Sequence, residues 1–312
     1  MVVKKVLVTG GSGFVGSHLV RRLLEAGIEV FLFRRKPKEE IDSVKVTNVS
    51  VDYLNEPLIT HELAEINPDC IIHLSSSRDR ASFVNYQLPK FYDDVAADFN
   101  LIMASSKLPD LKSFLYFGTA DIYSDEGVLN AKSPVLPKNP YGLRKSMCIS
   151  LVNSLARSQN FPAVCLIPSI IYGPGQKTEM FLPALIDSLI KNQRFSMSDG
   201  NQMRDYIYVK DVVDVVLKHI SELNLACLGR TILLGSGEAV SIKELALMVE
   251  PLIVVNKDSL LDIGSIEQRS RETKGYSFDM NESFELLDWK PKFSLHDGLL
   301  ETIEHAKGAA HA

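Results

Sequence analysis

The clearest indication of chemistry is a tyrosine followed four positions later by a lysine, in the segment Tyr141-Gly142-Leu143-Arg144-Lys145. On a helix this spacing places Tyr141 and Lys145 one turn apart on the same face. A phenol with an ordinary pKa of about 10 is a weak base at neutral pH, and a neighbouring ammonium favours the phenolate. The pair therefore suits general acid–base catalysis. The same spacing is common by chance, so two ordinary helix residues are the alternative.

A second pattern lies near the start of the chain, where residues 9–16 read Thr-Gly-Gly-Ser-Gly-Phe-Val-Gly. Gly10 permits a tight turn, Gly13 lets the backbone approach a pyrophosphate, and Gly16 lets a helix pack closely on a strand. The helix N-terminus then offers unpaired N–H groups and the positive end of its dipole to phosphates. An apolar run precedes the glycines and a helical pattern follows them. The segment predicts a dinucleotide site, with a purely structural turn as the alternative.

Both patterns require strands that end beside helix N-termini. Over the first two thirds of the chain, short apolar runs alternate with longer helical patterns. This alternation predicts an α/β fold with a doubly wound parallel sheet of the Rossmann type. The first five runs lack polar alternation, so we expect them to be buried on both faces. The predicted strands are residues 6–8, 30–33, 46–51, 70–72, 114–117 and 164–167, and helices are predicted at 15–26 and 141–158.

The pattern changes after Tyr172, where Gly173-Pro174-Gly175 interrupts it. We expect a nucleotide-binding domain and a smaller, discontinuous C-terminal substrate lobe. Ligands of open α/β sheets bind beyond the carboxyl ends of the strands, so the cleft between the two should hold the chemistry. Later helices are predicted at 181–191, 209–220 and 295–306, and a strand at 231–234. The predicted domain spans 1–172 with 206–235 returning to it, and the lobe spans 173–205 and 236–312.

Composition and charge exclude several classes of protein. The 312 residues are 46% hydrophobic and 23% charged, which suits a globular protein. Against 39 Asp+Glu there are 34 Lys+Arg, and this net charge of −5 gives no basic excess for nucleic acid. The uncharged stretch 158–176 contains Pro162, Pro168 and Pro174, which disfavours a membrane span. The first residues lack a signal-peptide pattern, so we expect a cytoplasmic protein.

The cysteines form no CxxC pair and no cluster with histidine. Most lie in apolar runs, which favours small buried hydrophobic residues over redox or metal chemistry. No metal site is expected. The four cysteines are Cys70, Cys148, Cys165 and Cys227.

Several motifs occur together in one order. The glycines are spaced GxxGxxG rather than GxGxxG, Asp52 follows the third predicted strand, and residues 73–76 (His-Leu-Ser-Ser) end the fourth. Further along lie residues 172–176 (YGPGQ), 204–209 (RDYIYV) and 287–291 (LDWKP). In this combination the chain resembles the extended short-chain dehydrogenases/reductases that modify nucleotide sugars, over nearly its whole length.

The resemblance implies a nicotinamide dinucleotide cofactor and a nucleotide-diphosphate sugar substrate. Asp52 would contact the adenine amino group, and Lys145 would bind the nicotinamide ribose. Arg204 and Arg269 would clamp the diphosphate, with ordinary surface arginines as the alternative. The implied cofactor contacts are Gly10, Gly13, Phe14, Val15, Gly16, Asp52, Tyr53, Leu74, Tyr141, Lys145 and Pro168. The implied substrate contacts are Ser76, Asp121, Tyr123, Ile171, Arg204 and Arg269.

The choice between the two dinucleotides depends on the end of the second predicted strand. NAD enzymes place an acid there for the ribose hydroxyls, whereas this chain has Arg34 and Arg35. Guanidinium groups attract the 2′-phosphate of NADP and can bind it in a bidentate manner. We therefore favour NADP(H), with NAD(H) possible. Two solvated loop arginines are the alternative.

The resemblance also implies Thr119 as the catalytic hydroxyl, because it stands four residues before Tyr123. It would hydrogen-bond the reacting sugar oxygen while Tyr141 exchanges a proton; a strand-end turn residue is the alternative. Tyr123 is interpreted as a positioning or packing residue. The family's 4,6-dehydratases carry an Asp-Glu pair after this hydroxyl, and this chain has Ala120 and Asp121. Full dehydratase chemistry is therefore disfavoured, although a relative that keeps only the second carboxylate stays open.

With dehydration disfavoured, the remaining reaction type is simple hydride transfer at a ring carbon of the sugar. The leading hypothesis is an NADPH-dependent 4-ketoreductase acting on a 4-keto-6-deoxy sugar nucleotide. The alternative is a 4-epimerase with tightly bound NAD, and a non-enzymatic NADP sensor is the rival from another class. We also expect a homodimer formed through helices at about 90–106 and 141–158. At residue 94 an aspartate replaces the asparagine usual in the family.

Overall fold

A computed structural model describes residues 3–35, 46–76, 87–124, 126–255, 258–267 and 275–310. Within these residues the largest sheet, here the main sheet, has seven strands in the order β11-β7-β5-β4-β1-β2-β3, all parallel. The predicted α/β fold with a doubly wound parallel sheet is confirmed. Its strands are β1 (Lys5–Thr9), β2 (Glu29–Arg34), β3 (Val46–Ser50), β4 (Cys70–His73), β5 (Ser113–Phe117), β7 (Ala163–Pro168) and β11 (Thr231–Leu234).

The central strands are buried on both faces, as their uninterrupted apolar runs predict. Every residue of β4 and β5 is buried. The expectation is wrong for β3, which has no buried residue. The reason is its place at the edge of the sheet, where it pairs only with β2 among the described strands. The four cysteines are all buried, as expected, and each is a free thiol.

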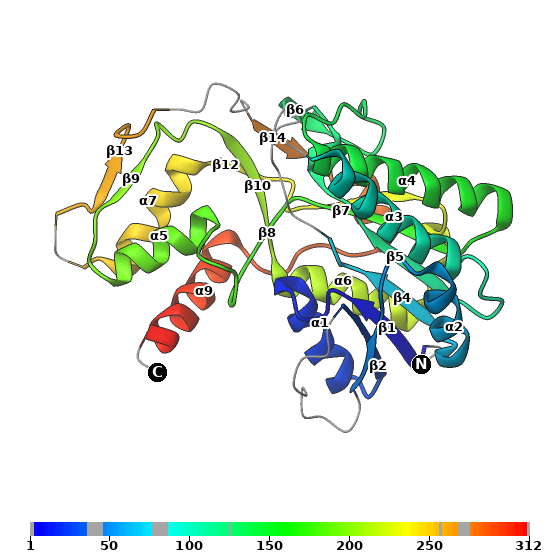
Figure 1. Ribbon diagram of the computed structural model, residues 1–312. Coiled ribbons are helices and arrows are strands. Elements are labelled where there is room, and N and C mark those ends of the chain that lie inside the picture. Colours follow the sequence, from blue (N-terminus) through cyan, green and yellow to red (C-terminus); the bar gives the residue numbers. More distant parts are fainter. Residues whose placement is uncertain are drawn as a thin grey trace.

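Helices cover both faces of the main sheet. Helices α1 and α6 pack together on one side, while α2, α3 and α4 pack on the other (Figure 1). This double layer buries the sheet, because a parallel sheet needs apolar cover on both faces. These helices are α1 (Phe14–Glu25), α2 (Glu56–Ile66), α3 (Leu88–Ser105), α4 (Pro140–Gln159) and α6 (Val209–Glu222).

A second sheet lies beyond the main one and draws its strands from distant parts of the chain (Figure 1). Its order is β12-β10-β14-β6, and β8 pairs with β10. It contains β6 (Glu126–Leu129), β8 (Ile170–Tyr172), β10 (Met203–Tyr208), β12 (Ala239–Ser241) and β14 (Gly275–Phe278). Around it lie β9 (Phe195–Met197), β13 (Leu261–Ile263), α5 (Phe181–Ile190), α7 (Ile242–Ile253) and α9 (Leu295–Ala310). Helix α8 (Asn281–Leu287) packs against β11 of the main sheet and the 3-10 turn η2 (Leu225–Cys227), and a second 3-10 turn is η1 (Ala120–Ile122).

Within the predicted returning segment 206–235, α6 and β11 lie on the main sheet, while residues 206–208 end β10 of the second sheet. The predicted domain boundaries themselves stay a prediction. No helix in the described part of the chain combines the length and apolar character needed to cross a bilayer.

Two buried aspartates, Asp205 and Asp211, accept hydrogen bonds from segments that lie far away in the sequence. The Asp205 carboxylate accepts hydrogen bonds from the backbone N–H groups of Ser236 at 2.8 Å and Gly237 at 3.0 Å, and from the Ser236 hydroxyl at 2.9 Å. Burial raises the pKa of Asp205, although these hydrogen bonds favour the carboxylate. Asp211 likewise accepts from the backbone N–H groups of Lys292 and Phe293. The RDYIYV motif and the two residues that follow the LDWKP motif are thereby tied into the fold.

Candidate active site

The glycine loop between β1 and α1 has the close packing that its sequence predicts. Gly10 adopts φ +72°, and a Cβ on it would lie 2.8 Å from the backbone nitrogen of Ser75. A Cβ on Gly16 would lie 2.2 Å from the carbonyl oxygen of Gly10. Gly13 is the N-cap of α1 and has no side chain to cap the helix. The loop and the first turn of α1, with Phe14 and Val15, therefore fit a phosphate group.

Five neighbouring strands of the main sheet end at one edge, and predicted site residues follow these ends. Thr9 of β1 lies opposite Phe33 of β2 and His73 of β4, while Phe117 of β5 lies opposite Leu166 of β7. Carboxyl ends of parallel strands are where ligands of this fold class bind. The predicted residues at or just beyond these ends are Gly10, Arg34, Leu74, Ser76, Thr119 and Pro168.

The residues predicted to hold the adenosine side lie at the end of β2 and after β3. Arg34 is half-buried, and its Nε and one terminal nitrogen are buried without a hydrogen-bond partner. Arg35 and Asp52 are exposed. The buried Tyr53 hydroxyl donates to the carbonyl oxygen of Phe33 at 3.2 Å. An unsatisfied guanidinium at this edge fits an anionic group of a bound dinucleotide.

The predicted catalytic residues lie on α4 and on the turn after β5. Lys145 is 1% exposed, and its Nζ donates to the carbonyl oxygen of Phe117 at 2.7 Å. Thr119 is buried and caps η1, accepting from the backbone nitrogen of Asp121 at 3.3 Å. Tyr141 is half-buried in the first turn of α4. The arrangement gives a phenol, an ammonium and a hydroxyl at one edge of the sheet.

A glycine allows α4 to approach that turn. A Cβ on Gly142 would lie only 2.3 Å from the carbonyl oxygen of Asp121. The start of α4 is fixed by Asn139, whose side chain accepts from the backbone nitrogen of Gly142 at 2.7 Å. Helix α4 therefore begins in direct contact with the segment that carries Thr119.

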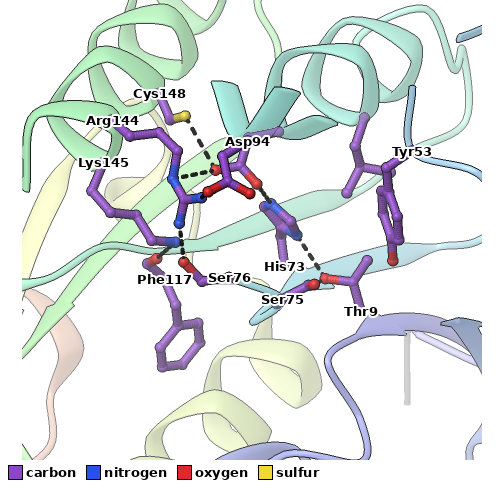
Figure 2. A network of polar contacts seen from close by, with 12 residues as sticks. Thr9, Tyr53, His73, Ser75, Ser76, Asp94, Phe117, Arg144, Lys145 and Cys148 are labelled. Carbon is purple, nitrogen blue, oxygen red and sulfur yellow. Dashed lines mark hydrogen bonds and ion pairs between the residues drawn. The ribbon is translucent and has the colours of Figure 1, made fainter. Parts of the chain in front are cut away.

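Charged side chains fill the space between α3 and α4. The Arg144 guanidinium is 3% exposed and lies 3.3 Å from an Asp94 carboxylate oxygen and 3.5 Å from one of Asp98. It also donates to the hydroxyl of Ser76 (Figure 2). The carbon of the guanidinium lies 5.7 Å from the ring centre of Tyr141. A buried cation is thus placed between the predicted catalytic tyrosine and the loop after β4.

The same network continues to the cofactor side. The other oxygen of Asp98 lies 3.1 Å from Nε2 of His73. Nδ1 of His73 lies 2.6 Å from the Thr9 hydroxyl (Figure 2). That hydroxyl accepts from the backbone nitrogen of Ser75 at 3.1 Å. A chain of polar contacts therefore runs from α4 to the residue before Gly10.

The pKa values of this network follow from its burial and charges. Burial lowers the pKa of His73, despite its hydrogen bond to Asp98, so the imidazole is neutral near pH 7. Burial alone would raise the pKa of Asp98, but the hydrogen bond from His73 and the charges of Lys145 and Arg144 hold it below its ordinary range. Asp98 is therefore a carboxylate at neutral pH.

The predicted substrate residues are more dispersed. Asp121 is half-buried at η1, and Ile171 is half-buried in β8. Tyr123 is 1% exposed, and burial raises its pKa to about 12, so it is not poised as an acid at neutral pH. Arg204 is half-buried in β10, with its guanidinium 5.9 Å from the ring centre of Tyr276. Arg269 lies outside the described residues.

Sequence reasoning did not find the contributions of Gly142, Asp98 and Arg144. The i, i+4 spacing of Asp94 and Asp98 on a predicted helix was an available signal, because it places two carboxylates on one face. Across the described ranges, no group of three His, Cys, Asp or Glu side chains is arranged to hold a metal ion.

A Rossmann-type sheet with a glycine loop and a Tyr–Lys pair at its carboxyl edge defines an NAD(P)-binding enzyme fold. The family model for the NAD dependent epimerase/dehydratase family matches residues 6–235. The chain belongs to this family of nucleotide-sugar-modifying enzymes, which confirms the resemblance to extended short-chain dehydrogenases/reductases.

Curated relatives align over nearly their full length. An uncharacterized UDP-glucose epimerase of Bacillus subtilis is 26% identical over 314 residues, which cover 96% of this chain and 97% of that protein. CDP-abequose synthase of Salmonella typhimurium is 28% identical over 306 residues, with 96% and 97% covered. Their names differ in reaction, so the family is shared while the specific chemistry is not resolved.

Solved structures share the fold. The dTDP-glucose 4,6-dehydratase of Bacillus anthracis in complex with NAD superposes with a TM-score of 0.86 at 20% identity, covering 99% of this chain and 98% of that chain. A UDP-glucuronic acid 4-epimerase of Bacillus cereus, in complex with UDP-glucuronic acid and NAD, gives 0.85 at 24% identity, covering 98% and 99%.

Proposed function

We propose that the protein reduces the 4-keto group of a nucleotide-activated 4-keto-6-deoxy sugar with NADPH. The observation that carries this proposal is Arg34, which stands at the end of β2 beside the glycine loop. Two of its guanidinium nitrogens are buried without a hydrogen-bond partner. A 2′-phosphate would satisfy them by charge-assisted hydrogen bonds and neutralise the guanidinium charge, whereas a free ribose hydroxyl would supply no opposite charge.

The chain's own residues supply the remaining chemistry. When bound, the dinucleotide supplies the hydride that adds to the carbonyl carbon of the sugar. Tyr141 delivers its phenolic proton to the oxygen that becomes the new hydroxyl. Thr119 hydrogen-bonds that oxygen and orients it toward Tyr141. Lys145, whose ammonium donates to the carbonyl oxygen of Phe117, stands one helical turn after Tyr141 and would bind the nicotinamide ribose.

Two features separate a reductase from a dehydratase. Residue 120 is a buried alanine, which has no proton to give to a departing hydroxyl. Only Asp121 follows it with a carboxylate, at the turn that α4 contacts. Arg204 on β10 is the described candidate for the diphosphate of the substrate, and Arg269 is a further candidate from the sequence.

A 4-epimerase is the second candidate function. The names of several relatives support it, including UDP-glucose epimerases of Bacillus subtilis and Methanocaldococcus jannaschii. The same Tyr–Lys pair would remove a proton from the substrate hydroxyl and later return it. This candidate requires tightly bound NAD and no exchange of the cofactor during turnover.

The test is to analyse the purified protein for bound NAD and then to run two assays in parallel. In the first, NADPH is offered with a 4-keto-6-deoxy sugar nucleotide; the proposal expects loss of NADPH absorbance. In the second, UDP-glucose is offered without added cofactor. Bound NAD together with conversion in the second assay alone would overturn the proposal in favour of the epimerase.

The role of Arg34 is tested by Arg34→Glu. Loss of a charge-assisted contact of roughly 1.5–3 kcal/mol lowers kcat/KM for NADPH by about 10- to 100-fold, and kcat/KM for NADH should not fall. Arg35→Glu measures how much the exposed neighbouring arginine contributes to kcat/KM for NADPH. Arg230→Gln, which removes an exposed arginine paired with Glu282, is the control and should leave both values unchanged.

A further inference from the structure

The charged network between α3 and α4 is balanced among its described members. Arg144 and Lys145 provide two positive charges, and Asp94 and Asp98 provide two negative ones, while His73 is neutral near pH 7. Removing one partner leaves an uncompensated buried charge, whereas well-packed apolar residues often replace a whole buried ion pair without loss of stability. Stability alone therefore does not explain why the network is present. Its function is inferred from the groups that it connects.

The donors of the network converge on the Asp98 carboxylate from two sides. Thr9 Oγ1 accepts from the backbone N–H of Ser75, so its own proton is available for Nδ1 of His73. The neutral imidazole then carries its proton on Nε2 and donates it to Asp98. The second oxygen of Asp98 faces the Nε of Arg144 and accepts from the Cys148 thiol at 3.5 Å. Each link fixes the orientation of the next.

Both ends of this chain touch the predicted machinery. Thr9 directly precedes Gly10, and a Cβ on Gly10 would meet the Ser75 backbone, so the glycine loop and the loop after β4 are in contact. At the other end, Arg144 lies between Tyr141 and Lys145 in the sequence of α4. Its contacts to Asp94 and to Ser76 reach the side where the substrate is expected.

We propose that Arg144 is a positioning residue that fixes α4 relative to the glycine loop, through Asp98, His73 and Thr9. Arg144 thereby sets how far the bound nicotinamide lies from Tyr141. A misplacement of about 1 Å in such a site costs roughly 100-fold in rate, so a rigid link between the two elements has a direct kinetic value. The inference rests on the proposed function only in the identity of the dinucleotide.

The test is a double-mutant cycle measured on cofactor binding without turnover. Arg144→Lys keeps the charge but cannot reach Asp94, Asp98 and Ser76 together. Thr9→Val removes the hydroxyl at the far end with little change in shape. NADPH is titrated against its nicotinamide fluorescence for both single variants and the double variant, and NADH is titrated in parallel. Arg157→Lys, on the exposed last turn of α4, is the matched control.

Each single variant should raise the Kd about 5- to 10-fold, and the double variant should raise it no further than the larger single effect. Such coupling between residues that do not touch reports a shared network. Thr9→Ser should restore the Kd, because it returns the hydroxyl. Should Arg144→Lys fail to fold, Arg144→Gln with Asp94→Asn keeps the charge balance and replaces it in the cycle.

Multiplicative effects of the two substitutions, or an unchanged Kd in Arg144→Lys, would overturn the positioning role. These outcomes are independent of the proposed reaction. A coupled cycle in a protein that reduces no 4-keto sugar would reject the proposed function alone. Active reduction with uncoupled Kd values would reject the role of Arg144 alone.

Discussion

Replacing Gly142 by alanine should separate catalysis from stability in this protein. The added Cβ would lie 2.3 Å from the Asp121 carbonyl oxygen and 3.0 Å from its carbonyl carbon. Carbon–oxygen contacts normally settle at about 3.3–3.6 Å. The start of α4, or the turn at Ala120–Ile122, must therefore shift by about 1 Å, and this shift moves Tyr141 away from Thr119.

The expected magnitudes differ for the two properties. A displacement of about 1 Å between reacting groups lowers kcat by roughly 100-fold. Forcing an extra carbon against backbone costs about 1–3 kcal/mol, while the better helix propensity of alanine offsets about 1 kcal/mol of it. The free energy of unfolding should therefore fall by no more than about 2 kcal/mol. Steady-state reduction of the proposed 4-keto substrate and urea denaturation measure the two quantities.

Gly308→Ala is the matched control, because a Cβ at this position in α9 would have no neighbour within 4 Å. It should leave kcat unchanged and add about 0.5–1 kcal/mol of stability. Wild-type kcat in Gly142→Ala would refute the argument that close approach of α4 aligns the site. A loss of both folding and activity would show a structural role instead.

Three further predictions concern the rest of the molecule. Tyr141→Phe should lower kcat at least about 100-fold with little change in the Kd for NADPH, and unchanged turnover would remove Tyr141 from the mechanism. Burial lowers the pKa of His219 to about 4, so the folded protein resists a proton that the unfolded chain accepts below about pH 6.5. The free energy of unfolding should therefore fall as the pH drops from about 6.5 toward 4, and His219→Gln should remove about 3 kcal/mol of that loss. Urea denaturation at several pH values measures it, and the same pH dependence in the wild type and the variant would contradict the prediction. Leu88 and Tyr92 on α3 are both 64% exposed and lie on the helix expected at the dimer interface. Tyr92→Asp should therefore shift the sedimenting species from dimer to monomer. Sedimentation of the wild-type protein as a monomer would contradict the expected dimer.

The main sheet could be predicted because its strands are signalled locally. Strands β1, β4 and β5 each contain a short run of apolar residues, at 6–8, 70–72 and 114–117, which is typical of buried parallel strands. The edge strand β3 was predicted as a strand but not as an exposed one, since edge position depends on the order of strands in space. The short strands β6, β8 and β12 had no local signal, because each has only three or four residues and pairs with a distant partner.

The residues of the candidate site likewise divide into those with a local sequence signal and those without one. Gly10, Gly16, Tyr141 and Lys145 are recognisable because each belongs to a motif with fixed spacing in the sequence. The contacts of Arg144 with Ser76 span 68 residues, and no periodicity in the sequence reports them. Such contacts arise when α4 packs on α3 above the ends of β1 and β4. Their discovery required the assembled fold.

The parallel pairing of β6 with β14 affects how the protein is made. Strand β6 begins at Glu126 and takes its partner from Gly275 onward, so the ribosome releases one strand long before the other. Until then β6 has unpaired backbone groups, and an open strand edge is a template for aggregation. The nascent chain can complete much of its main sheet early, while the second sheet must wait for the C-terminal strand. Slowed synthesis, or a stop codon before residue 275, should therefore yield a partly folded species that needs chaperone protection.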